Sequence, residues 1–197
     1  MRAVDGQFAD GGTPRRRLAA TAAALALWLV CPPASAADAL TESQVKAAYV
    51  YNFAKFVEWP TEAFATPQAP LVLCVAAKQS LGGALAGIDG KPVQGRALQV
   101  RWAAKPDEFK TCHMLFVPES EAPATPELLR KIGRLPVLTI GEREGFAAAG
   151  GGIGFVRGEE RVQFEINPDA ASRANLKISS QLLRLATIVR DTGTGTR

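Results

Sequence analysis

Residues 70–77 read PLVLCVAA, an apolar run that is rich in valine and leucine. A short run of this kind, without a polar residue at every second position, is typical of a strand that is buried on both faces of a sheet. The stretches CHMLFVP at residues 112–118 and LPVLTIG at residues 135–141 have the same character. Such strands occur mostly in parallel sheets, whose two faces are covered by helices.

Helices are predicted before and between these strands. Thr41 and Gln44 form a capping-box pattern, which predicts a helix over residues 42–59 that ends at Pro60. Three further elements are expected: short helices over residues 81–88 and 126–132, and an alternating strand, ALQVRW, over residues 97–102. This order predicts a single α/β domain with a mostly parallel central sheet of about five to six strands flanked by helices.

The stretch IGFVRGEERVQFEI at residues 153–166 predicts an antiparallel hairpin with its turn at residues 158–160. In the second arm, Val162, Phe164 and Ile166 alternate with the polar residues Arg161, Gln163 and Glu165. Because successive side chains of a strand point to opposite faces, this arm is expected to form a half-exposed antiparallel edge of the sheet.

Two helices are predicted after the hairpin. Asn167 is expected to cap a short helix that has Pro168 at its first position. A second helix is predicted over residues 178–189, followed by a frayed tail at residues 190–197. Its apolar residues recur at helical spacing and are expected to pack on the sheet: Ile178, Leu182, Leu185, Ala186 and Val189.

The N-terminal stretch, residues 1–36, has the three parts of a secretory signal. Three arginines at residues 15–17 precede an apolar run at residues 18–31, and Ala-Ser-Ala at residues 34–36 offers a cleavage site. The apolar run is shorter than the roughly 20 residues of a lasting membrane anchor. Lipidation of Cys31 is disfavoured because no small residue precedes it, and the twin-arginine pattern is loose. We expect secretion to the periplasm, with one domain over residues 37–197.

The charge of the secreted part argues against nucleic-acid binding. Taking the four arginines and two aspartates of the leader from the whole-chain charge of +4 leaves a net charge of +2. This charge is spread along the chain without basic runs, so it provides no electrostatic footprint for a polyanion.

Only two cysteines, Cys74 and Cys112, follow the leader. An even pair in an oxidising compartment predicts one disulfide, closing a loop of about forty residues and contributing roughly 3 to 4 kcal/mol. Two buried free thiols are the alternative. A catalytic cysteine is less favoured, because the only histidine, His113, directly follows Cys112 and would point to the opposite face of a strand.

The usual catalytic arrangements lack parts. The chain has one histidine and no Gly-x-Ser-x-Gly, and no spacing of histidines or cysteines is typical of a metal site. The run GGGIGF at residues 150–155 is interpreted as a flexible lead-in to the hairpin rather than a phosphate loop. Glu159 and Glu160 are interpreted as a solvated hairpin tip. The sequence therefore predicts a protein that is not an enzyme and uses no metal or cofactor.

A cluster of polar residues lies where the predicted hairpin meets the predicted short helix. Such a junction can present backbone N–H groups and fixed charges to a small-molecule ligand or a partner. The alternative is helix capping with surface ion pairs. The residues of this cluster are Glu165, Asn167, Asp169, Arg173 and Lys177.

The first helix carries an aromatic stripe. At 100° per residue, one face collects Val45, Tyr49, Phe53, Phe56 and Trp59, which predicts core packing. Asn52 falls inside this stripe and is expected to be buried and hydrogen-bonded, because an unsatisfied amide would cost about 1 to 3 kcal/mol. Tyr51 projects nearly opposite and is a candidate surface contact.

Two motifs resemble the YfiR family of periplasmic regulators: VKAAYVYNFAKFVEWP at residues 45–60 and IGFVRGEERVQFEINPDAASRANLKISSQLLRLATIV at residues 153–189. The resemblance extends over essentially the whole secreted chain. It implies an α/β domain, often dimeric, that binds the periplasmic sensor region of a membrane-bound diguanylate cyclase, inhibits it and keeps cyclic di-GMP low. It also implies that an outer-membrane lipoprotein can sequester the regulator.

The resemblance further implies release of the inhibition by envelope or redox stress, which would give a bridge between Cys74 and Cys112 a role beyond stability. Two other classes remain open. One is a periplasmic solute-binding protein with a small-molecule ligand, and the other is an enzyme that depends on Glu165 or Arg173; both rank below the regulator.

Overall fold

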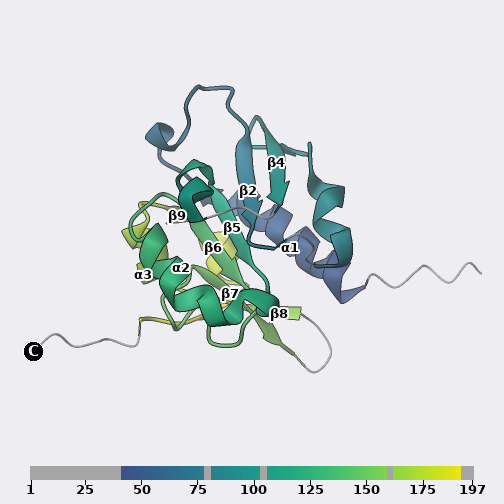
Figure 1. The fold of residues 1–197 in the computed structure, drawn as a ribbon, viewed down its shortest axis with the longest axis vertical. Helices are drawn as coiled ribbons and strands as arrows, with labels where there is room; N and C mark the ends of the chain where they lie inside the picture. Colours follow the sequence, from purple (N-terminus) through teal and green to yellow (C-terminus); the bar gives the residue numbers. More distant parts are fainter. Residues whose placement is uncertain (1–40, 78–80, 103–105, 159–161, 192–197) are drawn as a thin grey trace, which may run out of the picture. The chain divides into compact units, whose positions relative to one another are not determined.

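The computed structural model describes residues 41–77, 81–102, 106–158 and 162–191. Their core is an eight-stranded sheet in the order β10-β8-β7-β6-β5-β2-β4-β3 (Figure 1). Four strands in its middle run parallel to one another: β2 (Leu71–Val75), β4 (Arg96–Trp102), β5 (Met114–Val117) and β6 (Leu138–Gly141). The predicted single α/β domain with a mostly parallel sheet is thereby confirmed.

The remaining strands complete the two sides of the sheet. β7 (Ile153–Arg157) is parallel to β6 and antiparallel to β8 (Val162–Ile166), while β10 (Thr187–Ile188) runs parallel to β8 and β3 (Pro92–Val93) antiparallel to β4. The sheet has more strands than expected because β3 and β10 contain two residues each, too few to show a periodicity. A separate antiparallel pair joins β1 (Val57–Glu58) to β9 (Lys177–Ile178).

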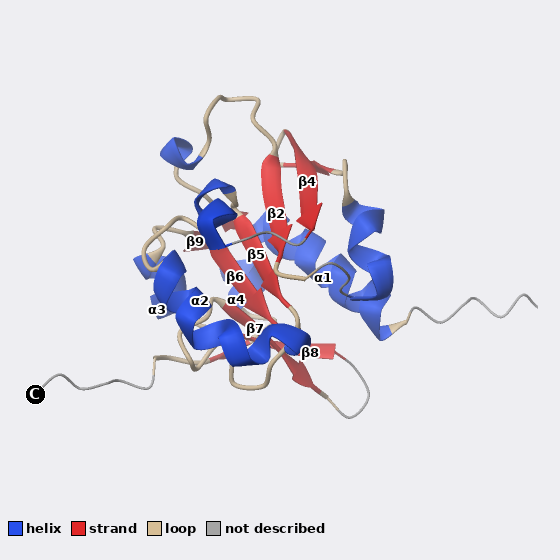
Figure 2. Cartoon of the chain, in the orientation of Figure 1, coloured by secondary structure: helices blue, strands red, loops and turns tan. Residues whose placement is uncertain are grey.

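Helices cover both faces of the sheet, with α1 (Glu42–Phe56) behind it and α2 (Thr125–Ile132) in front of it in Figure 2. The alternation of β2 explains this layering: Leu71, Leu73 and Val75 belong to the cluster that α1 completes, and Val72 and Cys74 to the one that α2 completes. All five residues of β2 are buried, as the apolar run predicts. The shorter helices are α3 (Pro168–Arg173), α4 (Ser180–Leu183) and the 3₁₀ turns η1 (Thr61–Ala63), η2 (Leu81–Ile88), η3 (Pro106–Thr111) and η4 (Glu119–Ala124).

The first helix begins as predicted, with the capping box of Thr41 and Gln44, but ends at Phe56 instead of Trp59. The next two residues form β1, and the carbonyl of Phe56 accepts a hydrogen bond from the amide of Ser179. A long-range backbone pairing therefore replaces the last turn of the predicted helix. Trp59 is still buried, as expected.

The buried face of α1 is rotated from the predicted stripe. Its fully buried side chains are Ala47, Val50, Phe53 and Ala54. The prediction for Asn52 is wrong: its side chain is exposed, because the apolar face is centred on the small residues beside Phe53. Tyr51 is not on the far side of the helix either. It is half-buried and packs against the core.

The hairpin of β7 and β8 is confirmed, with Phe164 and Ile166 buried. Its tip, with Glu159, Glu160 and Arg161, lies outside the described residues. The second arm is not the edge of the sheet, since β10 pairs with it.

The glycine run before the hairpin is buried and closely packed, so the interpretation as a flexible lead-in is wrong. A Cβ atom on Gly151 would lie 2.8 Å from the carbonyl oxygen of Phe146, and one on Gly152 would lie 3.0 Å from that of Thr139. Glycine is required here because the backbone lies directly on the neighbouring chain.

The predicted helix over residues 178–189 is also wrong. The segment forms β9, the single turn α4 and β10. Leu182 is buried as expected, but Leu185 is 72% exposed and Ile188 is 44% exposed. Among the helices of the described residues, none has the length and apolarity needed to cross a membrane. Residues 1–36, the expected signal peptide, lie outside the described part.

Candidate functional site

Asn167 is the centre of the predicted polar cluster, and its side chain is fully buried. As the N-cap of α3, its Oδ1 accepts hydrogen bonds from the amides of Asp169 (3.0 Å) and Ala170 (3.1 Å). Its Nδ2 donates to the carbonyl of Ala147 at 2.8 Å and to Asp191 Oδ1 at 2.7 Å. The predicted cap is confirmed, and every donor and acceptor of the buried amide has a partner.

Two ion pairs surround Asn167 and hold the end of the described chain. Arg173 pairs with Asp191, and Arg190 Nη1 donates to Asp169 Oδ1 at 2.6 Å. Burial acts to raise the pKa of Asp191, but hydrogen bonds from Asn167 and Arg173 outweigh it and hold this pKa below its ordinary value. We refer to these five residues as the C-terminal clasp. Arg190 and Asp191 were not among the predicted site residues, because residues 190–197 were expected to form a frayed tail.

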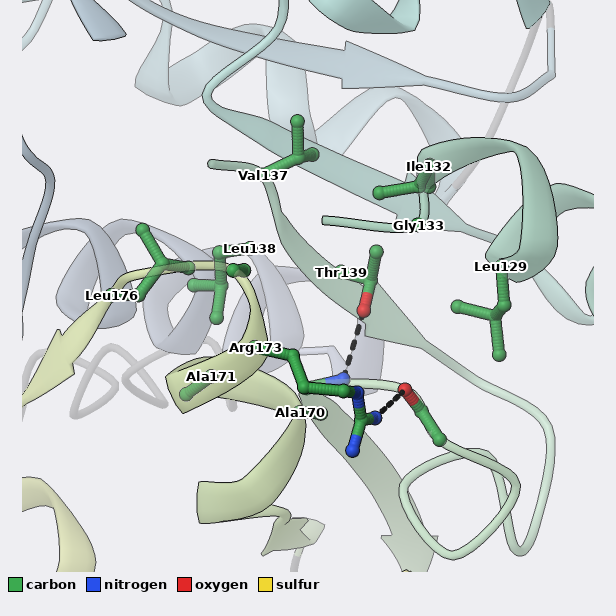
Figure 3. A pocket seen from close by; sticks show the side chains of 13 residues that line it. Leu129, Ile132, Gly133, Val137, Leu138, Thr139, Ala170, Ala171, Arg173 and Leu176 are labelled. Carbon is green, nitrogen blue, oxygen red and sulfur yellow. Dashed lines mark hydrogen bonds between the residues drawn. The ribbon is translucent and has the colours of Figure 1, made fainter. Parts of the chain in front are cut away.

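The cavity beside the clasp is too small for an organic ligand. Its volume is about 30 Å³, which is enough for about one water molecule. Figure 3 shows its wall: Thr139 Oγ1 accepts from the amide of Gly152 at 2.8 Å, and Arg173 Nη2 donates to the carbonyl of Gly150 at 3.4 Å. Arg173 is thus engaged by Asp191 and Gly150.

The two remaining members of the predicted cluster lie on other elements. Glu165 is half-buried on β8, in register with Gly154 of β7 and Thr187 of β10. Lys177 is exposed on β9, opposite Glu58 of β1. The fold therefore gathers Asn167, Asp169 and Arg173 into one structure and leaves Lys177 in a different environment.

Lys177 lines a larger hollow, which we call the β1–β9 groove. It has a volume of about 260 Å³ and is lined by Glu58, Trp59, Pro60, Thr61, Glu62, Asn175 and Lys177. Two carboxylates, one ammonium group and one amide can complement a small polar molecule that carries both charges, such as an amino acid. Asn175 adopts a left-handed conformation, with φ of 54°, which asparagine tolerates better than most residues.

Tyr51, the predicted surface contact, is held within the fold. Its hydroxyl donates to the carbonyl of Pro92 at 2.7 Å. The Nζ atoms of Lys55 and Lys91 lie 4.2 and 5.6 Å from the ring centroid, within the range of cation–π interactions. A partner would therefore meet the two lysines together with the ring.

The predicted disulfide between Cys74 and Cys112 is present, with a Cα–Cα distance of 5.8 Å. It joins the buried strand β2 to the residues just before β5. Cys74 is 1% exposed and Cys112 is 4% exposed, and both lie in the core cluster that α2 completes. The bridge is therefore shielded from solvent in the folded protein.

Among the described residues, no group of three or more histidine, cysteine, aspartate or glutamate side chains could hold a metal ion.

Among solved structures, the fold is similar to a conserved domain protein from Vibrio cholerae O1 biovar El Tor str. N16961, with 10% sequence identity and a TM-score of 0.46. The match covers 76% of this chain, which spans only 60% of the length of that protein. At this level the similarity carries no argument about function. No curated protein matches the sequence.

The sequence model of YfiR/HmsC-like proteins matches residues 43–187. This match runs from the first helix to β10 and contains the motif at residues 45–60 and nearly all of the motif at residues 153–189. The chain belongs to the YfiR/HmsC-like family.

Proposed function

We propose that this protein binds the periplasmic sensor region of an inner-membrane diguanylate cyclase and inhibits it, which lowers cyclic di-GMP in the cytoplasm. The observation that carries the proposal is the family match over residues 43–187. Family membership supports, in general, a periplasmic regulator of diguanylate cyclase with a regulatory rather than a catalytic role.

The environment of the only histidine supports a binding role. Both ring nitrogens of His113 lie within hydrogen-bonding distance of backbone atoms, Nδ1 at 3.0 Å from the amide of Val72 and Nε2 at 3.1 Å from the carbonyl of Ala63. A general base needs a free lone pair that faces its substrate. His113 is buried and its lone pair is already used.

The apolar side chains near the C-terminus are the first place to look for the cyclase contact. Leu185 is 72% exposed, and Ile188, three residues further along the chain, is 44% exposed. Large apolar side chains left in water favour an interaction surface when a protein partner is expected. Leu185 also lies within the matched family region. Glu165, Arg173, Lys177 and Tyr51 remain candidate contacts with a ligand or a partner.

The proposal includes further partners that the family suggests. An outer-membrane lipoprotein would compete with the cyclase for this protein and so relieve the inhibition. The protein would act as a homodimer. Both statements are testable by co-purification and by light scattering of the purified secreted chain.

The test of the main proposal is deletion of the gene in a strain that expresses a candidate cyclase. Deletion should raise cyclic di-GMP and biofilm formation, and the wild-type gene should lower both to their original levels. Complementation with Leu185→Ser should lower them less, although the variant protein accumulates normally. If cyclic di-GMP and biofilm stay unchanged while the cyclase is expressed, the proposal is wrong.

Binding of a small molecule is the second candidate function, because the β1–β9 groove has the size and the charges for it. A ligand at 100 times its dissociation constant stabilises the folded state by about 2.7 kcal/mol. A thermal-shift screen with amino acids and nucleotides should then identify a stabilising compound. Lys177→Ala should remove the shift but leave the melting temperature of the free protein unchanged. Absence of any stabilising compound would count against this function.

A further inference from the structure

His113 joins three parts of the fold through its backbone and side chain. It lies between β2 and β6: its amide donates to the carbonyl of Val72 and its carbonyl accepts from the amide of Leu138, both at 2.9 Å. The same carbonyl accepts the indole N–H of Trp59 at 2.9 Å. The residue is 7% exposed, so its ring has little access to water.

The hydrogen bonds of the ring require its neutral form. The backbone amide of Val72 can only donate, so Nδ1 of His113 must accept through its lone pair. The carbonyl of Ala63 can only accept, so Nε2 must carry the hydrogen. A proton added at Nδ1 would face the N–H of Val72, breaking that hydrogen bond and placing a charge in the core.

The charged groups around the ring also oppose protonation. Phe64 stacks on the imidazole with centroids 4.4 Å apart, and the guanidinium of Arg96 lies 3.6 Å from the Phe64 centroid. Arg96 and Arg101, both on β4, are close enough to repel a charge on the ring. The side chain of Glu62, on the turn η1, is exposed. Burial, followed by repulsion from the two arginines, lowers the pKa of His113 in spite of the hydrogen bond to the carbonyl of Ala63.

The segment over residues 59–66 depends on these contacts. His113 touches it at Trp59, Ala63 and Phe64. Its far end is held by Arg96, whose Nη1 lies 3.3 Å from the carbonyl of Thr66. Residues 59–62 of the same segment form one wall of the β1–β9 groove. The bond from Nε2–H to the carbonyl of Ala63 survives protonation, so release requires the charged ring to turn away from the amide of Val72 toward water. That movement would break the contacts with Ala63 and Phe64 and so loosen the wall of the groove.

We propose that His113 makes the segment over residues 59–66 an acid-sensitive element: neutral His113 holds the segment on the sheet, and protonation releases it and opens the wall of the β1–β9 groove. The proposal rests on the contacts of His113 and does not depend on the identity of any partner. It adds a condition under which binding at the groove would change.

The size of the effect follows from proton linkage. Release is coupled to uptake of one proton, so the open fraction should rise as pH falls below the ordinary histidine pKa of about 6.5, by about fivefold in the first pH unit and by at most about tenfold per unit after that. The rise should stop at the lowered pKa of the closed form. Because the chain contains one histidine, a single imidazole signal reports the protonation without ambiguity in a preparation that carries no histidine tag.

The test is hydrogen exchange by mass spectrometry on peptides that cover residues 59–70, at pH 7.5, 6.5 and 5.5. Rates are corrected for the intrinsic pH dependence of exchange, and peptides from β7 and β8 serve as the reference for global unfolding. In the wild type, opening of the 59–70 peptides should rise up to about fivefold between pH 6.5 and 5.5 while the reference peptides stay protected. His113→Asn, which keeps an acceptor near Val72 but does not titrate, should show no such rise.

A second measurement keeps the proposal falsifiable if His113→Asn does not fold. NMR titration of the wild-type imidazole should show a pKa below 6.5, and the indole N–H signal of Trp59 should change over the same pH range. If the imidazole gains its proton while exchange over residues 59–70 stays constant, the proposal is overturned. It is equally overturned if the 59–70 and reference peptides open together.

Discussion

Removing the Cys74–Cys112 bridge should lower the free energy of unfolding by about 4 kcal/mol. The two cysteines are 38 residues apart in sequence, and the chain-entropy relation for a loop of that length gives this value at 25 °C. For a domain of this size, about 2–4 °C is lost per kcal/mol, so the double variant Cys74→Ala/Cys112→Ala should melt about 8–16 °C lower. Alanine is preferred to serine because it does not bury a hydroxyl group.

The assay compares thermal unfolding of the double variant and the wild type by circular dichroism, each with and without dithiothreitol. The variant should be insensitive to the reductant. The native wild type should also resist it at 25 °C, because both cysteines are nearly fully buried and a reductant must reach the sulfur atoms. Reduction should lower the wild-type curve only once unfolding has begun.

Two results would refute the reasoning. A double variant that melts within about 2 °C of the wild type would mean that pairing of β2 with β5 already restricts the unfolded chain, leaving the bridge little to contribute. Rapid reduction of the native wild type would mean that the protein opens locally at this point. The second result would favour the redox role that the family resemblance implies.

Three further predictions follow from individual contacts. Gly151→Ala should lower the free energy of unfolding, measured by urea titration, by about 1–3 kcal/mol, because the new methyl group meets the carbonyl oxygen of Phe146. The control Gly87→Ala, which has open space around the new methyl group, should change the free energy of unfolding by less than about 0.5 kcal/mol. The pKa of Asp191 is lowered in the folded state. The stability that its ion pair with Arg173 contributes is therefore fully present above the ordinary aspartate pKa of about 4 and is lost as pH falls through the lower, folded pKa. Asp191→Asn should show fast amide exchange in β10 already at neutral pH, and equal protection in the two proteins would contradict the clasp. Leu185→Ser should keep the wild-type melting temperature and weaken cyclase inhibition. Leu182→Ser, at a position 3% exposed, should lower the melting temperature instead.

The central strands could be predicted because their environment leaves a clear pattern. β2, β5 and β6 are buried along their whole length, so they appear as unbroken apolar runs, and the parallel arrangement follows from that pattern. The disulfide could be predicted from the cysteine count and the leader. These features depend on composition over short stretches and not on distant partners.

The segment over residues 178–189 shows why other elements could not be predicted from the sequence. Its apolar residues have helical spacing, yet the amide of Ser179 donates to the carbonyl of Phe56 and that of Val189 donates to the carbonyl of Ile166. Both acceptors lie in elements far away in the sequence. The middle of the segment, QLLRLA at residues 181–186, consists of good helix formers, so these tertiary pairings override the local preference and determine the structure.

The candidate site was predicted only in part for the same reason. Asn167 could be identified from a local capping pattern. Arg173 and Asp169 could be named, but their partners Asp191 and Arg190 are 18 and 21 residues away, and no local pattern connects them. The misplacement of Asn52 has a different origin: a projection based on large residues ignores that small ones, such as Ala47 and Ala54, allow the closest approach of a helix to a sheet.

The sheet ends on each side in a strand of only two residues, β10 and β3. Pro92 in β3 has no backbone N–H to offer. An incoming chain would find few unpaired backbone groups on either side, which protects the protein from aggregation by strand addition. We therefore expect any dimer of this protein to be held by side-chain contacts between surfaces, and not by a sheet that continues from one copy into the next.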